Sequence, residues 1–369
     1  MMSKHTIAGL DLPNIDESSK LYRILASAMH KHLERSPVAP SCPLITRHPH
    51  QPPSRPSNRP SNRLPFKAPT PSTRTHPGSH QSQDSLVLQH NDTTHVNPSE
   101  SSLLTMPSCD AYWDASHFGL DRVTLFTNAT PEEQRNILAL TNLDVLQESY
   151  CIEKAGMGYM SRMVLLSESV QERMIYTLFA ADETSHFVQL HPYLPVEPTV
   201  TDNSFLNLLS EVVEGDDKTV LLFVIQVVLE GWGLSHYRSL AKTCTYEALS
   251  HTLQGFLQDE SRHHGTGVTL FNQASMSPAS HIAIVDILEQ FLRMVQVGPQ
   301  GIIEAIARVK GHLSRTQKIQ ILTELDTEQH SGTRLQVLRS LMRGDGAGAI
   351  VQDLEERGSF APLPAHHCV

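Results

Sequence analysis

The sequence predicts an all-α protein built on a four-helix bundle, with additional C-terminal helices and a disordered N-terminal insertion. A doubled motif, Asp-Glu-x-x-His, occurs at residues 182–186 and 259–263. Prolines and glycines fall between the periodic segments, with a break expected at Gly215. The third observation is a set of four long segments with helical spacing of apolar residues, at about 141–166, 169–191, 204–240 and 245–273.

The N-terminal part of the chain has two contrasting segments. Within residues 1–35, positions 15–34 predict an amphipathic helix that Asp16 can cap. Residues 36–101 hold 13 of the 23 prolines and no acidic residue before Asp84. Such a segment buries too little apolar surface to offset the entropy of ordering it, so it is expected to be disordered.

The bundle is expected within residues 102–275. Apolar residues at 103–128 can pack on it, and Pro131 suits the first turn of a short helix. Residues 346–369 follow Gly344 and contain several Gly, Pro and His, so they predict a flexible tail. Accessory helices within 276–345 are predicted at about 279–296, 299–312, 315–326 and 332–343.

Composition excludes several classes of function. The net charge of −10 and the absence of a Gly-rich phosphate loop argue against a nucleic-acid or nucleotide binder. Five scattered cysteines without a C-x-x-C pair favour a reducing compartment. No secretory signal follows Met1, and the apolar stretch 220–229 is too short for a membrane span. A cytoplasmic protein without membrane contact is therefore predicted.

The two motifs carry the candidate chemistry. Residues three apart share a helix face, so Glu183 with His186, and Glu260 with His263, can each hold one metal ion. A lone glutamate stands 30 residues before each motif glutamate, and carboxylates can bridge two cations. The predicted ligands of this dinuclear metal site are Glu153, Glu183, His186, Glu230, Glu260 and His263.

The context of the lone glutamates supports this assignment. Glu230 follows the apolar run 222–229, where an unpaired carboxylate is costly. Glu148 competes with Glu153 but lies five residues earlier, about 140° away around the helix. The equal spacing of 30 residues favours Glu153.

Four further polar residues are candidates for the shell around the ligands. A metal-bound histidine commonly donates its free N–H to a carboxylate. In a two-fold bundle, Asp182 can reach His263 and Asp259 can reach His186. Gln226 and His264, one turn from ligands, are either donors to the site or satisfied buried polar groups.

The same helical phase predicts a mostly apolar pocket beside the metals, which would shield a bound reactant from water. Gly156 and Gly233 each follow a lone glutamate by three residues. They either open space for substrate or allow close helix contact. The predicted pocket residues are Gly156, Met157, Met160, Phe187, Gly233, Leu234, Tyr237 and Phe256.

These motifs resemble those of the ferritin-like di-iron carboxylate superfamily. The strings at 182–186 and 259–263 are similar to those of bacterial multicomponent monooxygenases, desaturases and the ribonucleotide reductase small subunit. The resemblance covers about residues 140–273. It implies a left-handed four-helix bundle, the six ligands above, two iron ions (Fe/Fe, or Mn/Fe) and O2 as co-substrate.

Individual subfamilies match less well. Leu190 stands where the reductase subunit has its radical-forming tyrosine. Gly233 replaces a second glutamate of rubrerythrins, and Phe256 replaces an additional histidine of p-aminobenzoate N-oxygenases. The resemblance therefore supports the superfamily and no particular member.

Three functions remain as hypotheses. The first is a di-iron oxidase or oxygenase that acts on a small organic substrate and receives electrons from a ferredoxin or reductase. The second is a ferroxidase or peroxidase in iron or oxidative-stress handling. The third is a metal-stabilised binding protein. Extra helices beyond the bundle favour the first, because iron oxidation alone does not need them. The oligomeric state is left open.

Overall fold

The computed structural model describes residues 18–34, 112–194, 203–344 and 346–369. Every regular element in these ranges is helical, which confirms the predicted all-α class. The segment predicted to be disordered, 36–101, lies outside the described residues.

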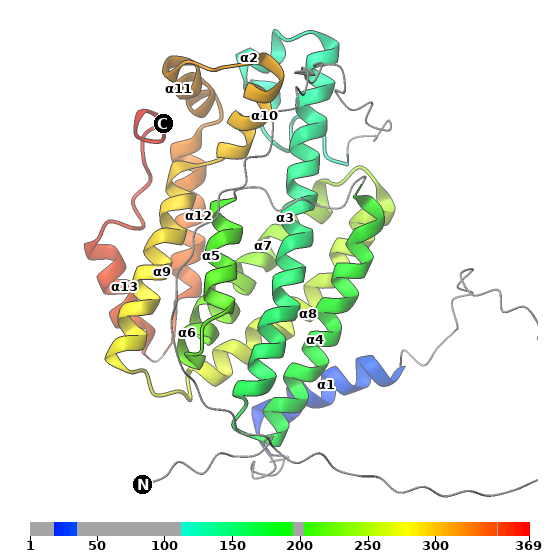
Figure 1. Cartoon of the computed structure of the whole chain (residues 1–369), viewed down its shortest axis with the longest axis vertical. Helices are drawn as coiled ribbons and strands as arrows, with labels where there is room; N and C mark the ends of the chain where they lie inside the picture. The colour runs from blue at the N-terminus through cyan, green and yellow to red at the C-terminus, as the bar shows by residue number, and fades with distance from the viewer. Residues whose placement is uncertain (1–17, 35–111, 195–202, 345) are drawn as a thin grey trace, which may run out of the picture. The chain divides into compact units, whose positions relative to one another are not determined.

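Four long helical stretches form the bundle and lie side by side (Figure 1). They are α3 (Pro131–Leu166), α4 (Val170–Leu190), the continuous stretch α6–η4–α7 (Lys218–Thr243) and α8 (Glu247–Phe271). The links within the pairs α3–α4 and α7–α8 are three residues each, whereas the crossover between the pairs runs from 191 to 217. Two hairpins joined by one long crossover are compatible with a ferritin-like bundle.

Local sequence explains where the first two of these helices begin. Thr130 and Glu133 form a capping box at the start of α3, and Pro131 occupies the first turn. The short helix predicted from Pro131 and the long one predicted from about 141 are one helix of 36 residues. Ser169 caps α4 by accepting a hydrogen bond from the Glu172 backbone N–H.

The predicted third helix is interrupted near Gly215, as expected. Before the break lies a separate helix, α5 (Ser204–Val213), capped by Asn203. After the break come α6 (Lys218–Leu221), the π-helix η4 (Leu222–Leu229) and α7 (Glu230–Thr243). A π-helix widens the turn, and here it ends directly before the candidate ligand Glu230.

Within the described residues, one stretch, Lys218–Thr243, is long and apolar enough to cross a membrane by composition. Most of it is buried inside the bundle, and seven consecutive residues of η4 from Leu222 to Val228 are buried. Burial in the bundle core accounts for its apolar character.

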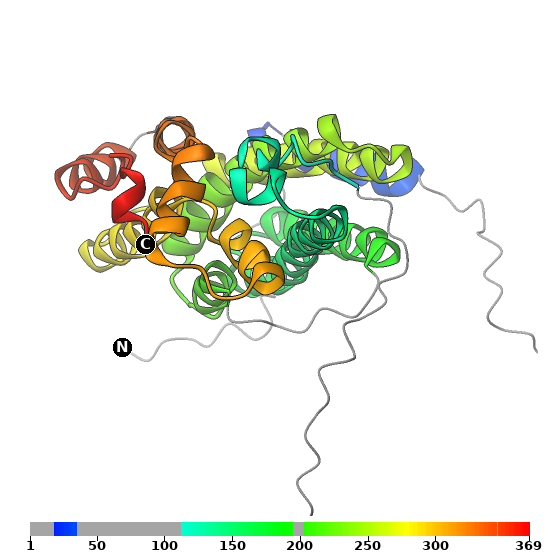
Figure 2. The ribbon, with the colours of Figure 1, turned by 90° about the horizontal axis from the view of Figure 1, so that it is seen from above.

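The remaining helices surround the bundle. Helix α1 packs on α4 and α8, α10 packs on α3, and α9 packs on α5, α12 and α13. Figure 2 shows α1 at the opposite side of the bundle from α9 and α13. The long ones are α1 (Lys20–Glu34), α9 (Pro278–Val297), α10 (Gln300–Lys310), α11 (Arg315–Glu324), α12 (Thr327–Leu341) and α13 (Ala347–Glu356). The short ones are η2 (Leu120–Arg122), α2 (Thr124–Thr127), η3 (His191–Tyr193) and η5 (Ala365–His367).

The prediction of a flexible tail at 346–369 is wrong. Helix α13 fills much of this range and packs against α9. Ala347, Ile350 and Leu354 share one face at helical spacing, and all three are fully buried. The glycines suggested fraying, but this apolar face outweighs their low helix propensity.

The segment before α3 is tied to the bundle through Trp113, as its apolar residues predicted. Its side chain is fully buried, and its indole N–H donates to the Leu240 carbonyl oxygen at 2.9 Å. Its backbone N–H donates to the Asn142 side chain at 2.8 Å. These contacts place residues 112–127 over one end of the bundle.

Candidate metal centre

The six predicted ligands come together in the bundle interior. Two groups form, each with ligand atoms within 4.8 Å of one another. The first contains Glu153, Glu183, His186 and Glu260, and the second contains Glu230, Glu260 and His263. Glu260 belongs to both, which is the arrangement a bridging carboxylate requires between two cations.

Each histidine turns the same ring atom toward the carboxylates. The Nδ1 atom of His186 lies 3.1 Å from Glu153 Oε2 and 3.3 Å from Glu260 Oε1. The Nδ1 atom of His263 lies 3.0 Å from Glu183 Oε1 and 3.7 Å from Glu260 Oε2. Both Nδ1 atoms therefore face the space between the carboxylates, where a metal ion would take their lone pairs.

The crossed pairing of aspartates and histidines is present. Asp259 Oδ2 lies 3.1 Å from His186 Nε2, and Asp182 Oδ2 lies 3.4 Å from His263 Nε2. A carboxylate accepts from a ring N–H, so each aspartate holds the proton on Nε2 and leaves Nδ1 free as a ligand. Each motif thus orients the histidine of the other motif.

The carboxylates are electrostatically crowded. Burial, with Glu260 and Glu153 nearby, raises the pKa of Glu183 to about 8. Burial also raises the pKa of Glu230 well above its usual range. Burial acts against ionisation of Glu260 as well, but hydrogen bonds to His186 and His263 lower its pKa to about 2.

Both histidines respond to these carboxylates. Burial alone would lower their pKa values, but hydrogen bonds outweigh it and raise the pKa of His186 and of His263 well above the usual value. For His186 the first of these bonds is to Asp259, and for His263 it is to Asp182. Without cations, the cluster is charge-balanced by protons.

A buried oxygen atom without a partner indicates whether metal ions fit. Glu230 Oε2 is buried and makes no hydrogen bond. A buried polar atom without a partner is costly, and Glu230 belongs to the second group together with Glu260 and His263. A cation there would satisfy this oxygen, and the mixed carboxylate and imidazole set suits Fe(II), Mn(II) or Zn(II).

The structure separates Glu153 from its competitor. Glu153 is buried in the cluster, and the Tyr237 hydroxyl donates a hydrogen bond to it. Glu148 is absent from both groups and accepts a hydrogen bond from the Asn203 side chain at 3.2 Å. The choice made from the 30-residue spacing agrees with this placement.

A mostly apolar cavity of about 100 Å³ adjoins the cluster. Four of the predicted ligands line it: Glu153, Glu183, Glu230 and Glu260. Gly156, Gly233 and Tyr237 are the predicted pocket residues that line it. Its other lining residues are Glu148, Ile152, Ala155, Tyr159, Phe205, Leu209, Val213, Ile225, Leu229, Trp232 and His236.

The other predicted pocket residues do not line this cavity, which corrects those predictions. Phe256 stacks on the ring of His186, with centroids 4.1 Å apart. Phe187 stacks on Tyr150 at 4.3 Å, and Met160 is fully buried in the main core. Met157 and Leu234 are half-buried away from the lining. Helical phase predicted which residues face the bundle interior. It did not predict on which side of the Glu/His cluster the cavity lies.

Helix α5 was missed as a wall of the pocket. Phe205, Leu209 and Val213 recur at helical spacing and line the cavity. The sequence signal was present in Asn203, which caps α5 and marks it as a separate helix. Because residues 204–240 were predicted as one interrupted helix, α5 was not expected to be a separate helix beside the cavity.

The hydrogen bonds of the Gln226 and His264 side chains go to main-chain oxygens and to Tyr176 and not to the side chain of a predicted ligand. The Gln226 amide donates to the His263 carbonyl oxygen at 3.0 Å and accepts from Tyr176 at 2.6 Å. His264 Nδ1 lies 3.0 Å from the Gln226 carbonyl oxygen. These contacts join η4 to α8, which matches the alternative of satisfied polar groups.

Lys31 is a polar neighbour of the centre that sequence reasoning missed. Its ammonium lies 2.5 Å from Asp182 Oδ1 and also contacts Asp259. Arg262 pairs with Asp259 and lies 3.7 Å from Asp182 Oδ2. No local sequence pattern predicts that Lys31 contacts these aspartates, because it lies in α1, 151 residues before Asp182.

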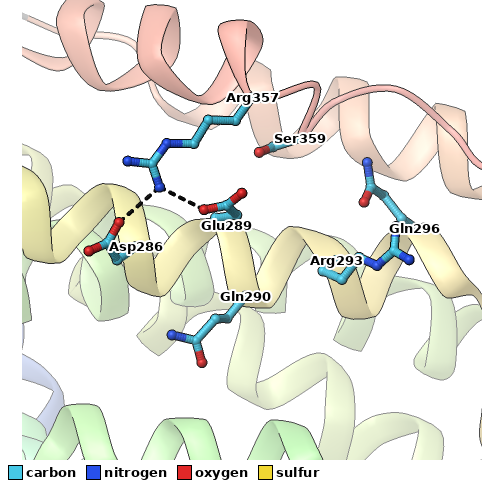
Figure 3. Close-up of a pocket in the computed structure, with 7 residues that line it drawn as sticks. All are labelled: Asp286, Glu289, Gln290, Arg293, Gln296, Arg357 and Ser359. Carbon is cyan, nitrogen blue, oxygen red and sulfur yellow. Dashed lines mark hydrogen bonds and ion pairs between the residues drawn. The ribbon is translucent and has the colours of Figure 1, made fainter.

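A second hollow, of about 630 Å³, lies between α9 and the segment after α13 (Figure 3). Arg357 crosses it and pairs with Asp286 at 2.8 Å and Glu289 at 2.6 Å. It contains none of the predicted site residues.

Comparison of the chain with family models and curated proteins, and of its structure with solved structures, finds no significant match. The description of the centre therefore rests on this chain's own residues and geometry. They show a helical protein with a buried Glu/His cluster that can hold metal ions.

Proposed function

We propose that this protein is an O2-dependent non-haem di-iron oxidase or oxygenase that acts on a small, mainly apolar organic substrate. The observation that carries the proposal is the apolar cavity that opens onto four carboxylates of the candidate metal centre. A ferroxidase or peroxidase uses Fe(II) or H2O2 and needs no apolar cavity at the metals. The cavity therefore favours an organic substrate.

The lining defines the class of substrate. Most of the side chains are aliphatic or aromatic, and they come from α3, α5, η4 and α7. Polar groups away from the ligands include Glu148, whose pKa is raised by burial, and His236, whose pKa is lowered to about 4 by burial. Burial disfavours the charged form of both groups. A hydrocarbon chain or ring with one hydrogen-bonding group fits such a site.

Two iron ions, or a manganese and an iron, would supply the reaction with O2 when bound by the six ligands. In an oxygenation, one oxygen atom enters the substrate and the other leaves as water. Two electrons and two protons are then required, and we assign their supply to a ferredoxin or reductase. The Phe256 ring over His186 and the apolar cavity wall exclude water from the reacting side.

The protein's own groups hold protons at defined places. Asp182 and Asp259 keep the Nε2 protons of the two histidines, so that both rings present Nδ1. The Tyr237 hydroxyl donates to Glu153 and lines the cavity. Tyr237 is therefore positioned to orient this ligand and to touch bound substrate.

The cellular setting belongs to the same proposal. Cys151, Cys244 and Cys368 are free thiols among the described residues, which suits a reducing cytoplasm. We assign no nucleic-acid or membrane partner. Self-association of the chain is compatible with the proposal and is not needed to complete the site.

Metal analysis followed by O2 uptake tests the proposal. Anaerobic Fe(II) loading is expected to give two metal ions per chain, and Glu230→Ala should lose at least one of them. Fewer than two ions in the wild type, unchanged by Glu230→Ala, would falsify the dinuclear site.

The choice of substrate class has its own test. O2 uptake by the Fe(II)-loaded protein is measured with reductant, with and without a panel of small apolar alcohols, acids and amines. Stimulation by a panel member, together with an oxygenated or desaturated product, supports the oxygenase or oxidase. Uptake that depends on Fe(II) alone, or consumption of H2O2 without any organic product, supports the ferroxidase or peroxidase instead.

A further inference from the structure

The two halves of the metal centre are not equivalent in their charges. In the second motif, Arg262 stands three residues after Asp259 and pairs with it. In the first motif, the corresponding position after Asp182 is Ser185, which carries no charge. The internal repeat therefore lacks one cation, although its aspartate has the same role toward a histidine.

Helix α1 brings a cation to this position. Lys31 Nζ lies 2.5 Å from Asp182 Oδ1 and contacts Asp259 as well. The side chains are 14% exposed for Lys31 and 0% for Asp182, so solvent screens the pair little. The other basic group at Asp182 from α1 is His32, whose Nε2 lies 3.1 Å from the same oxygen.

The helix that carries Lys31 is held by apolar contacts. Leu25 and Ala28 of α1 are buried, and α1 packs on α4 and α8, the helices that carry the two motifs. Lys31 lies at the end of this helix, where a cation is also favourable toward the helix dipole. The position of Lys31 is thus fixed by packing in addition to its ion pairs.

Charge accounting explains why a cation is needed. Two divalent metal ions would neutralise the four glutamates of the centre, provided both histidines are neutral ligands. Asp182 and Asp259 then remain as two buried negative charges, and Arg262, which pairs with Asp259 and lies 3.7 Å from Asp182, supplies a single positive charge. Lys31, which contacts both aspartates, supplies the second, and a buried carboxylate without a balancing charge is strongly unfavourable.

We propose that Lys31 is a positioning residue of the metal centre, which replaces the arginine missing from the first motif and makes α1 a part of the site. The inference rests on the proposed metal site. By holding Asp182, Lys31 fixes the orientation and tautomer of His263, which in turn presents Nδ1 to the metal.

A Co(II) titration, followed by its visible absorption, tests this inference in the full chain. Lys31→Met keeps most of the side-chain stem and removes the charge. Because loss of an outer partner of a metal ligand typically costs about 10- to 100-fold in affinity, we expect weaker Co(II) binding in that range. Arg23→Ala is the matched control, since Arg23 is an exposed cation on the same helix.

A charge transplant distinguishes positioning from mere support of α1. Ser185→Arg, in the Lys31→Met background, restores a cation three residues after Asp182 and is expected to recover most of the affinity. Unchanged affinity in Lys31→Met overturns the inference. So does a loss that Ser185→Arg fails to recover while α1 becomes open to trypsin.

Failure of the metal site itself has a different signature. If the wild type binds no Co(II), the proposed function fails before the variants are compared. If the wild type binds two ions and Lys31→Met equals Arg23→Ala, only the role of Lys31 is lost.

Discussion

Gly156 and Gly233 occupy equivalent positions after Glu153 and Glu230, but they meet different surroundings. A Cβ atom at Gly156 would lie 2.4 Å from Glu183 Oε2, whereas one at Gly233 meets nothing within 4 Å. Both glycines line the cavity, as the first explanation expected. Gly156 in addition lets the Glu183 carboxylate of α4 approach α3, whereas Gly233 leaves open space.

This difference predicts opposite effects of alanine. Gly156→Ala should displace the Glu183 carboxylate and weaken Fe(II) or Co(II) binding by about 10-fold or more. Gly233→Ala should bind metal normally and gain up to about 1 kcal/mol from its higher helix propensity. Metal titration and thermal unfolding of both variants measure these effects. Equal metal affinities in the two variants would contradict the placement of Glu183.

The raised pKa of Glu183 makes a prediction about the metal-free protein. Its folded pKa, about 8, exceeds the ordinary glutamate pKa of 4.5, so the folded state holds a proton that the unfolded state releases. Stability should therefore fall as pH rises from about 5 to 8, by up to about 1.4 kcal/mol per pH unit for each such proton. The raised pKa values of His186 and His263 act in the same direction.

The pH effect is measured by unfolding of chelator-treated protein across pH 5 to 8. Carboxyl groups with lowered pKa values, such as Glu260, lose their stabilising effect only as pH falls below about 4.5, outside this window. His236, whose pKa is lowered to about 4 by burial, opposes the slope up to about pH 6.5 and leaves it unchanged above that. Glu183→Gln has no proton to release there and should flatten the slope. Stability that rises with pH in the wild type would rule out the crowding of carboxylates.

Residue types and spacing predicted the Glu/His cluster well but its polar neighbours only in part. The i,i+3 geometry and the 30-residue repeat depend on helices alone, so they identified the six clustered residues and the aspartates that cross to the opposite histidines. Lys31 depends on how α1 docks, and Gln226 on which main-chain atoms come within its reach. Neither follows from periodicity, because tertiary contacts between distant helices decide them.

At the level of elements, the sequence predicted where helices occur better than it predicted the type of helix. Apolar spacing identified α4, α8 and the helices from α9 to α12. The π-helix η4 has the same apolar composition as an α-helix, so the sequence held no signal for its wider turns. Helix α13 was missed because glycine and proline content was weighed above its short apolar face.

Helix α13 provides a stability test at this scale. Ile350→Ala removes a fully buried side chain and should destabilise the protein by about 2–5 kcal/mol, or release α13 from α9. Gln352→Ala, at an exposed position of the same helix, should change stability by less than about 0.5 kcal/mol. Urea unfolding and protease sensitivity of the C-terminal segment compare the two. Equal stability and equal protease sensitivity of the two variants would support the original prediction of a flexible C-terminal tail.

For the whole molecule, the candidate metal centre lies where four helices meet. Its residues come from α3, α4, α7 and α8, and their carboxyl groups are crowded together. Cations bound there would replace protons and attract all four helices at once, which would couple metal binding to global stability.

Metal loading should therefore raise the unfolding temperature substantially. A ligand at about 1,000 times its Kd adds about 4 kcal/mol. A chain with more than 200 ordered residues gains about 2–4 °C per kcal/mol, so a rise on the order of 10 °C is expected. Calorimetry of metal-free and Mn(II)-loaded protein measures it. Glu153→Gln should remove most of the rise. Glu148→Gln should retain it, because Glu148 is a half-buried residue five positions earlier that accepts its hydrogen bond from Asn203. If both variants keep the full rise, the metal stabilises the fold from somewhere other than the bundle centre.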